Sequence, residues 1–421
     1  MVSDSSRQSS PSRPSTLSRR SALAGLGSGL VGLGALRASD SSAASESNAA
    51  ARSNAGSDPT LDWPMARYDA AGTGYDPDAT GPKDGAKVKW RREPDRFSGG
   101  TSSPILLGGT LYATGRVLLA LDAATGETRF AHEGSYRSSP AGSAAEAYDT
   151  ETLATAAPRG VYGLNAGGGL RLFGRQFGVE RWHGPGREPG FSVFGPPTVV
   201  PPVAVGGTVY AAVPGTKHVA ALDASSGREL WRASPGDELR RPAVRDGRVF
   251  AVNWPSRATA YDAATGERLW RTDLGEQMVL APTATREGVV VPDRTGVTLL
   301  DADDGSVRWR ADHGGNATEG AAAVAEGTVY VQSATGGRLH ALDLETGEQL
   351  WSAPDFSEGT PVVADGVVYG RNYDELVALD AADGSVRWRY ESRVPLSTPA
   401  VGDGTIYLVA HDRLLALEED R

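Results

Sequence analysis

Six polar residues precede short apolar segments, at positions that could bring their side chains together around one axis. They are Arg240, Arg241, Gln277, Glu319, Glu358 and Arg393. Most are followed by a proline-led run, such as PAVR at 242–245 or PVVA at 361–364. Carboxylate and carbonyl oxygens suit Ca²⁺, and guanidinium groups suit carboxylates or phosphates. The six residues predict a site for a small polar ligand or a cation, although solvated charges that pair with one another are an alternative.

Other patterns that carry chemistry are missing from the chain. There is no GxSxG elbow, P-loop, HExxH or EF-hand sequence, and the six histidines have no metal-ligand spacing. The glycine-rich GLNAGGGL at 163–170 is predicted to connect two strands, because a strand follows it where a phosphate site would need a helix. The chain has no Cys, which excludes disulfides, thiolate metal sites, c-type haem attachment and a lipidated N-terminal Cys. Asn316 begins a glycosylation sequon.

Two long segments could contact a partner. They are residues 132–150, after Phe130, and residues 183–202, after Trp182. Long loops on a rigid scaffold often carry function, although a tolerant surface can also accumulate insertions. Phe191 and Phe194 would form a small apolar knob suited to a partner, or would cover the edge of a neighbouring sheet.

The composition narrows the class of protein. The 421 residues include 53 Gly and 26 Pro, which disfavours long helices and favours an all-β fold. The formal net charge is −10, and Lys occurs only at 83, 87, 89 and 217. An acidic, Lys-poor surface predicts a halophilic protein and disfavours nucleic acid or anionic lipid as a partner. A codon preference for Arg would also explain the scarcity of Lys.

The N-terminus has the pattern of an export signal. Arg19 and Arg20 precede an apolar, glycine-rich run at 22–36 that is too short for a comfortable membrane span. Residues 1–36 are therefore predicted to be a twin-arginine signal peptide, and the Ser/Ala-rich residues 37–61 a disordered linker. The mature chain is expected to be extracellular or on the cell surface, without a membrane span. A disordered basic tail is the alternative.

A repeat of about 40 residues organises the rest of the chain. The copies follow the pattern DxxTGxxxW with substitutions, as in LDASSGRELW at 222–231, where Ser stands in the place of Thr. The copies end at Trp90, Phe130, Trp182, Trp231, Trp270, Trp309, Trp351 and Trp388. The turn aspartates are Asp122, Asp223, Asp262, Asp301, Asp343 and Asp380, with Gly174 and Glu418 in the place of Asp in two copies. These Asp, Gly and Trp residues are expected to be structural.

The repeat predicts the fold. Each copy reads as a four-stranded antiparallel sheet, in which Asp accepts backbone N–H groups of its turn and Gly supplies a positive φ. The Trp offers a flat surface for packing against the next sheet. Because the last copy lacks its final strand, residues 87–90 are predicted to pair with 413–418 and close the ring. The prediction is an all-β, eight-bladed β-propeller at 87–421, preceded by a leader segment at 62–86.

The repeat also resembles a known family. ALDAATGETRF, ALDASSGRELW and ALDLETGEQLW are similar to the tryptophan-docking repeat of the pyrroloquinoline-quinone (PQQ) type propellers, over residues 87–421. Residues 62–77 resemble the leader of such propellers in secreted archaeal proteins. The resemblance implies either the scaffold lipoprotein of bacterial outer-membrane assembly or a quinoprotein dehydrogenase. The dehydrogenases hold PQQ and Ca²⁺ over the axis, with an Asp base and usually a Cys pair.

The chain departs from the dehydrogenase pattern. It lacks Cys, long blade insertions and a haem site, and no Asp, Glu or Asn cluster aligns with the family's ligands. The function expected is an exported, non-catalytic scaffold that binds an envelope protein or a glycan, without a cofactor and as a monomeric ring. The alternative is a PQQ-dependent alcohol or sugar dehydrogenase with PQQ and Ca²⁺ on the axis.

Overall fold

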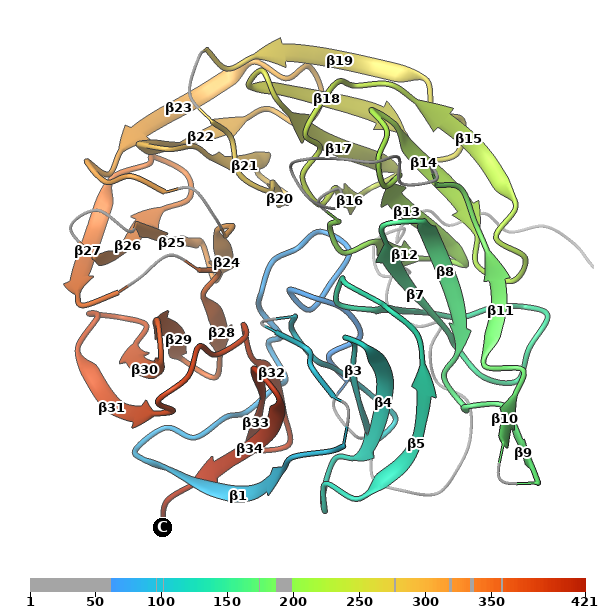
Figure 1. Ribbon diagram of the computed structural model, residues 1–421. Coiled ribbons are helices and arrows are strands. Elements are labelled where there is room, and N and C mark those ends of the chain that lie inside the picture. Colours follow the sequence, from blue (N-terminus) through green and yellow to red (C-terminus); the bar gives the residue numbers. More distant parts are fainter. Residues whose placement is uncertain are drawn as a thin grey trace, which may run out of the picture. The chain divides into compact units, whose positions relative to one another are not determined.

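The computed structural model describes residues 62–95, 97–100, 102–173, 175–186, 199–275, 278–317, 320–333, 337–356 and 359–421. Its regular elements are 34 β-strands, which form eight four-stranded antiparallel sheets and one two-stranded sheet. The eight larger sheets are the blades of a ring (Figure 1), so the predicted eight-bladed propeller is confirmed. The predicted signal peptide and linker, residues 1–61, lie outside the described residues. Within the described ranges, no helix has the length and apolar character to cross a membrane.

The blades are numbered 1 to 8 along the chain. Blade 1 consists of β2 (Ile105–Leu107), β3 (Thr110–Ala113), β4 (Val117–Asp122) and β5 (Thr128–Glu133). Blade 2 consists of β6 (Ala141–Ser143), β7 (Thr152–Ala157), β8 (Gly160–Asn165) and β11 (Glu180–His183). Blade 3 consists of β12 (Val203–Val205), β13 (Thr208–Ala212), β14 (Val219–Asp223) and β15 (Glu229–Ala233). Blade 4 consists of β16 (Ala243–Arg245), β17 (Arg248–Asn253), β18 (Arg257–Asp262) and β19 (Arg268–Asp273).

The second half of the ring repeats the arrangement. Blade 5 consists of β20 (Thr283–Ala284), β21 (Val289–Pro292), β22 (Gly296–Leu300) and β23 (Val307–Asp312). Blade 6 consists of β24 (Ala323–Ala325), β25 (Thr328–Ser333), β26 (Arg338–Asp343) and β27 (Gln349–Pro354). Blade 7 consists of β28 (Val362–Ala364), β29 (Val367–Asn372), β30 (Glu375–Asp380) and β31 (Val386–Glu391). Blade 8 consists of β32 (Ala400–Gly402), β33 (Thr405–Ala410), β34 (Arg413–Glu419) and β1 (Ala86–Arg92), and a hairpin of β9 (Leu170–Leu172) and β10 (Arg175–Phe177) extends from blade 2.

The core lies between the blades. Middle strands such as β4 and β7 are buried on both faces, because each blade packs against two neighbours, and their sequences are continuous apolar runs. Outer strands such as β19 alternate between exposed and buried residues. The buried clusters continue from blade to blade, for example from β8 of blade 2 through blade 3 into blade 4. No blade could bury both of its faces alone, so the ring is the stable unit.

Blade 8 joins the two ends of the described chain. Strand β1 pairs antiparallel with β34, with Lys87 opposite Glu418 and Trp90 opposite Ala416. The predicted closure by residues 87–90 is therefore confirmed. A register shift separates Val88 from Trp90, and a comparable shift occurs beside the outer-strand Trp or Phe of every other blade.

Candidate functional site

Each outer-strand tryptophan is fixed by one hydrogen bond, to the following blade or, for Trp388, to the leader. Its indole N–H donates to a backbone carbonyl at 2.8–3.0 Å, as in the bond from Trp231 to Ala263. The other donor and acceptor pairs are Trp90 with Ala123, Trp182 with Ala224, Trp270 with Ala302, Trp309 with Leu344, Trp351 with Ala381 and Trp388 with Pro82. The indole is both buried and satisfied, which a Trp at an interface requires.

The turn beneath each tryptophan is shaped to receive it. In blade 3, Asp223 accepts hydrogen bonds from the backbone N–H and the hydroxyl group of Ser226, and these bonds lower the pKa of its carboxyl group. Gly227 has a φ of 68°, and a Cβ there would lie 2.6 Å from the Trp182 ring. The Asp and Gly of the repeat therefore build an inter-blade joint, and their geometry offers no open position for a substrate.

The leader segment supplies the joint that blade 8 lacks. The Pro82 carbonyl accepts hydrogen bonds from the Trp388 indole and the Tyr369 hydroxyl group, each at 3.0 Å. The Glu419 carboxylate accepts the backbone N–H groups of Lys83 at 2.6 Å and Asp84 at 2.9 Å. Two ends of the chain thus reproduce one repeat turn.

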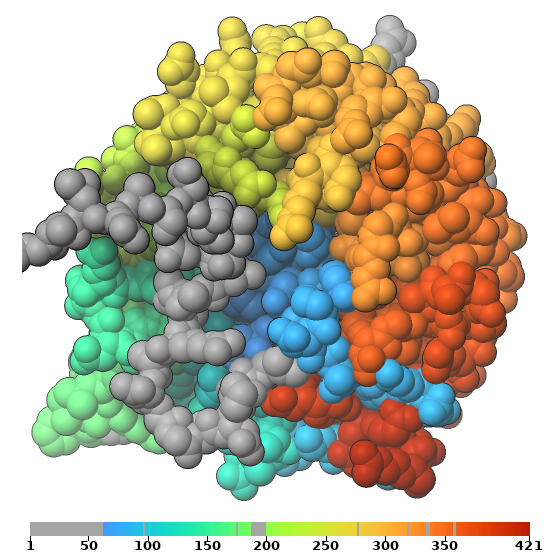
Figure 2. All heavy atoms as spheres, turned by 180° about the vertical axis from the view of Figure 1, so that it is seen from behind, coloured from blue at the N-terminus to red at the C-terminus, as the bar shows by residue number. Residues whose placement is uncertain are grey.

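The rest of the leader occupies the axis of the ring. Backbone N–H groups on blades 1, 2, 4, 5, 6, 7 and 8 each donate to a leader carbonyl at 2.8–3.0 Å. In blade order, the acceptors are Trp63, Pro64, Ala70, Ala71, Thr73, Gly74 and Thr80. Met65 and Ala70 pack against the buried residues of blade 3. Seen from behind, blue atoms near the start of the described chain lie in the middle of the ring (Figure 2). The innermost strands therefore bind the chain's own leader.

Two buried arginines fasten the leader to the blades. Arg67, which is 6% exposed, donates to the carbonyls of Pro282 at 3.1 Å and Ala322 at 2.7 Å, and to the Thr283 hydroxyl group. Arg241, which is 4% exposed, donates to the Asp69 carbonyl at 3.0 Å. Burial lowers the pKa of both, to about 10 for Arg241, and the nearby charge of Arg241 lowers the pKa of Arg67 further. Arg67 was not among the residues expected from the sequence, because its partners lie more than 200 residues away.

Only three of the six predicted axial residues, Arg240, Arg241 and Arg393, are among the described residues, so the convergence of the set stays a prediction. Arg241 is buried against the leader and is not a solvated charge at a mouth. Arg240 is half-buried and donates to the Val279 carbonyl at 3.0 Å, whereas Arg393 is exposed. Gln277, Glu319 and Glu358 lie outside the described residues. Of the predicted axial residues that the structure describes, Arg241 is the one with a hydrogen bond to the leader.

The described residues do not fit PQQ and Ca²⁺ on the axis. Where side chains are described, no three His, Cys, Asp or Glu groups come together as metal ligands. Ca²⁺ requires several oxygen ligands, and the leader carbonyls nearest the axis already accept hydrogen bonds from the blades. His313 and His340 stack at 5.6 Å, and burial lowers the pKa of each, but no third ligand accompanies them. Within the described residues, the axis therefore provides contacts for the leader.

Blade 2 corrects one alignment of the repeat. Asn165, and not Gly174, takes the position of the turn Asp, since Asn165 pairs with Thr152 as Asp223 pairs with Thr208. The Asn165 side-chain oxygen accepts the Gly167 N–H at 2.9 Å, as an Asp would. Gly174 lies outside the described residues. The residues between this turn and β11 are therefore an insertion within blade 2.

The insertion is the hairpin β9–β10, which projects from the rim of the ring (Figure 1). Leu170 pairs with Phe177, and Leu172 lies two residues further along, so the three side chains share one face. They are 61%, 51% and 46% exposed, and Phe173 at the tip is fully exposed. The alternation in LRLFGRQF was the sequence signal for this face. It was missed because Gly174 was assigned to the turn.

The two phenylalanines proposed for a partner knob, Phe191 and Phe194, lie outside the described residues. The first of the two long segments, 132–150, includes β6 and packs into blade 2 through Tyr136, whose ring lies 5.7 Å from that of Tyr162. Residues 138–141 are buried, whereas most of residues 144–150 are exposed, including Tyr148. The hairpin carries further exposed apolar side chains of blade 2.

Comparisons with known proteins agree with this architecture. A family model described as outer membrane protein assembly factor BamB matches residues 215–354 and 337–420. The structure is similar to BamB from Moraxella catarrhalis, with a TM-score of 0.61 and 15% identity over 79% of this chain and 100% of that chain. It is also similar to quinohemoprotein alcohol dehydrogenase from Comamonas testosteroni, with a TM-score of 0.66 and 14% identity over 86% and 81% of the two chains.

A third similar structure is that of a designed protein, so likeness to this fold does not by itself indicate a function. The computationally designed Ika8 protein matches with a TM-score of 0.61 and 15% identity, over 76% of this chain and 98% of that chain. Likeness at this level of identity reports the fold alone. No curated protein matches the sequence significantly. The family match over residues 215–420, together with the docked tryptophans and the turn chemistry, supports a PQQ-like β-propeller family for this chain.

Proposed function

We propose that the protein is an exported, non-catalytic scaffold that binds another protein of the cell envelope through the hairpin β9–β10. The observation that carries the proposal is the exposed apolar face formed by Leu170, Leu172 and Phe177. Exposed apolar groups that lie together on a soluble protein mark interaction sites. The leader on the axis supports the proposal as well, because it fills the position where a propeller of this family would hold a cofactor.

The hairpin favours a protein over a glycan as the partner. Its Leu and Phe side chains offer no hydrogen bonds to sugar hydroxyl groups, whereas they suit an apolar groove. A two-stranded hairpin is only marginally stable by itself, so a partner that covers it would also order it. Residues 163–179 contain two Arg and no Asp or Glu, in a chain of net charge −10. We therefore expect a groove bordered by carboxylate groups.

The test places a photo-crosslinking residue at Phe173 and exposes the tagged protein to envelope extract. One dominant crosslinked protein is expected. A matched control carries the same residue at Leu350, which is 55% exposed on β27 of blade 6. The paired substitution L172S/F177S should abolish the crosslink, whereas L269S on β19 should leave it intact. Equal crosslinking from both positions, or an unchanged product with L172S/F177S, contradicts the proposal.

The similarity to quinohemoprotein alcohol dehydrogenase leaves one other function to be tested. Titration of the purified protein with PQQ and Ca²⁺ separates the two functions. The scaffold proposal expects no saturable change in PQQ absorbance at micromolar protein and no dye-linked oxidation of alcohols or sugars. Saturable binding with turnover would replace the scaffold proposal by the dehydrogenase.

A further inference from the structure

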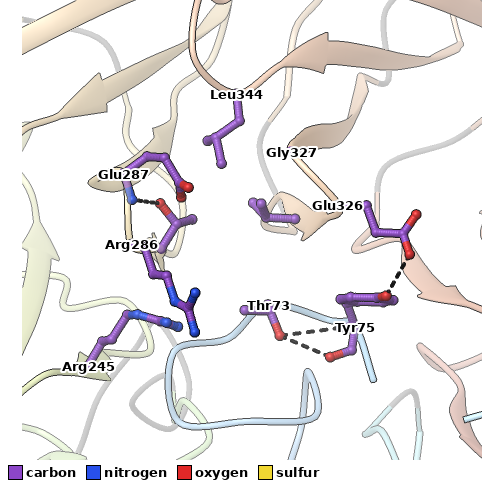
Figure 3. Close-up of a pocket in the computed structure, with 10 residues that line it drawn as sticks. Thr73, Tyr75, Arg245, Arg286, Glu287, Glu326, Gly327 and Leu344 are labelled. Carbon is purple, nitrogen blue, oxygen red and sulfur yellow. Dashed lines mark hydrogen bonds between the residues drawn. The ribbon is translucent and has the colours of Figure 1, made fainter. Parts of the chain in front are cut away.

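A pocket of about 360 Å³ lies beside the leader, between residues of blades 4, 5 and 6 (Figure 3). Thr73 and Tyr75 of the leader form one side. The turn between β20 and β21 and the turn between β24 and β25 form the others, and Arg245 at the end of β16 completes the lining. Three blades and the leader therefore contribute to one cavity, large enough for a small metabolite.

Two guanidinium groups converge in this pocket. Arg245 comes from blade 4 and Arg286 from the first turn of blade 5, and their ends approach each other beside Thr73 (Figure 3). Arg286 has no hydrogen bond or ion pair with any residue that the structure describes. The Nε atom of Arg245 is buried without a hydrogen-bond partner, and the nearest carboxylate is that of exposed Asp246, 3.4 Å away. No carboxylate from the pocket wall lies between the two like charges.

The side of the pocket opposite the two arginines is lined by aromatic, aliphatic and acidic side chains. The Tyr75 hydroxyl group donates to Glu326 at 3.0 Å, which holds the aromatic ring against the cavity. Leu344 and Val324 supply apolar surface nearby. Glu326 is already engaged by Tyr75 and lies across the pocket from the guanidinium groups, as Figure 3 shows. The charge in the pocket is therefore divided: at its cationic end the counter-ion of Arg245 is the exposed Asp246, and Arg286 has none among the described residues.

We propose that this pocket binds a small oxyanion, with a carboxylate or phosphate group held between Arg245 and Arg286. Paired guanidinium groups bind such anions through parallel N–H···O bonds, and a bound anion would remove the repulsion between them. The Thr73 hydroxyl group lies beside the guanidinium groups and donates to the Tyr75 carbonyl at 3.3 Å, which fixes the leader at this edge of the pocket. Any organic part of the ligand would lie over Tyr75 and Leu344. The site is independent of the hairpin and of the partner proposed for it.

Isothermal titration calorimetry of the full chain tests the site. Inorganic phosphate and succinate are titrated separately, at constant ionic strength set by sodium chloride. We expect saturable binding of at least one anion, with a dissociation constant of about 1 mM or lower. Saturation by phosphate alone identifies a phosphate site and saturation by succinate alone a carboxylate site. The absence of saturable binding by both anions overturns the proposal.

The variant R286Q assigns the binding to this pocket. Arg286 is exposed and unpaired, so its replacement should leave the thermal unfolding curve unchanged. Loss of one charged hydrogen-bond donor should weaken binding by about tenfold or more. The control R268Q removes the same charge from an exposed position on β19 and should bind as the wild type does. Equal affinity of R286Q and wild type would contradict the assignment, even where an anion binds.

Discussion

Blades 8 and 2 both depart from the repeat, but in opposite directions. Blade 8 lacks a strand and a turn, and the N-terminal segment supplies both through β1 and residues 82–85. Blade 2 keeps a complete set of four strands and adds the hairpin β9–β10 to them. The first departure is hydrogen-bonded into the ring and buries Pro82 and Trp90, although most other side chains of β1 are exposed, whereas the second exposes Leu and Phe side chains without such bonds across the ring.

The two departures differ in how many hydrogen bonds they make to the rest of the ring, and this difference distinguishes residues needed for the fold from residues available for binding. The leader satisfies backbone groups on seven blades and would leave them unpaired if it were removed, so its residues are needed for folding. Among the described residues, the side-chain hydrogen bonds between the insertion and the rest of blade 2 lie at the connection around Asn165 and Gly168. A departure from a repeat therefore suggests binding only where the extra residues are not used by the fold.

The largest difference is expected between Trp63 and Phe173. Trp63 is fully buried, packs 5.1 Å from the Tyr68 ring and pairs with Leu106 of blade 1. The substitution W63A should lower the free energy of unfolding by about 3–5 kcal/mol. F173A, at a fully exposed position, should change it by less than about 0.5 kcal/mol. Guanidinium denaturation measures both, and similar effects of the two substitutions would remove the distinction between leader and hairpin.

Arg67 should show the next largest effect. R67M keeps much of the side-chain volume but removes the donor to the Pro282 carbonyl and one of the two donors to the Ala322 carbonyl, which still accepts from the Thr283 hydroxyl group. Because buried acceptors without a partner are costly, we expect a loss of about 1–3 kcal/mol in the free energy of unfolding. Arg240 is the control, since it is half-buried with a single bond to Val279, and R240M should cost less. A larger effect of R240M would show that the leader is not fastened by Arg67.

The joint of blade 8 should be as strong as an ordinary joint. W388F and W231F each remove one indole hydrogen bond, to the carbonyls of Pro82 and Ala263 respectively. Each should lower the free energy of unfolding by about 1 kcal/mol. Thermal or chemical denaturation of the two variants in parallel makes the comparison. A negligible effect at Trp388, beside a normal effect at Trp231, would mean that residue 82 does not replace a repeat turn.

The smallest expected effect is the response to acid, which should have opposite signs in the two regions. Hydrogen bonds from Thr346 lower the pKa of Asp343 in its repeat turn, whereas burial raises the pKa of Asp69 in the leader. The stabilisation from Asp343 is present above its unfolded pKa, near 3.8, and is lost as the pH falls through the lower folded value. The destabilisation from ionised Asp69 is present above its raised folded-state pKa and is removed as the pH falls through it.

Unfolding measured from pH 7 down to about pH 3 tests these signs. D343N should make the loss of stability in acid shallower, and Asn165 shows that an amide can serve in such a turn. D69N should make the loss steeper, because it removes the opposing contribution. An acid response that both substitutions change in the same direction would contradict the assignment.

The repeat made the ring predictable, because Trp90 without a preceding turn and Glu418 without a following strand imply one shared sheet. The path of the leader was not predictable. Its contacts use backbone groups, which leave no residue pattern, and the bond from Arg67 to Ala322 spans 255 positions. The sequence placed the six axial residues just before the first strands of their blades. It could not show whether their side chains meet at the axis, because that depends on the conformation of the loops. The alternation of apolar and polar residues in the hairpin could be read from the sequence. It was missed because Gly174, and not Asn165, was assigned to the repeat turn of blade 2.

Hydrogen exchange at the innermost strands tests most directly whether the leader is a permanent part of the ring. The backbone N–H groups of Val244, Val324 and Val363 donate to Ala70, Thr73 and Gly74 of the leader. If the leader stays on the axis, these amides should exchange as slowly as the amides in the middle strands of the same blades. Exchange as rapid as that of the exposed hairpin would show that the leader leaves the axis, and would reopen that position to a ligand.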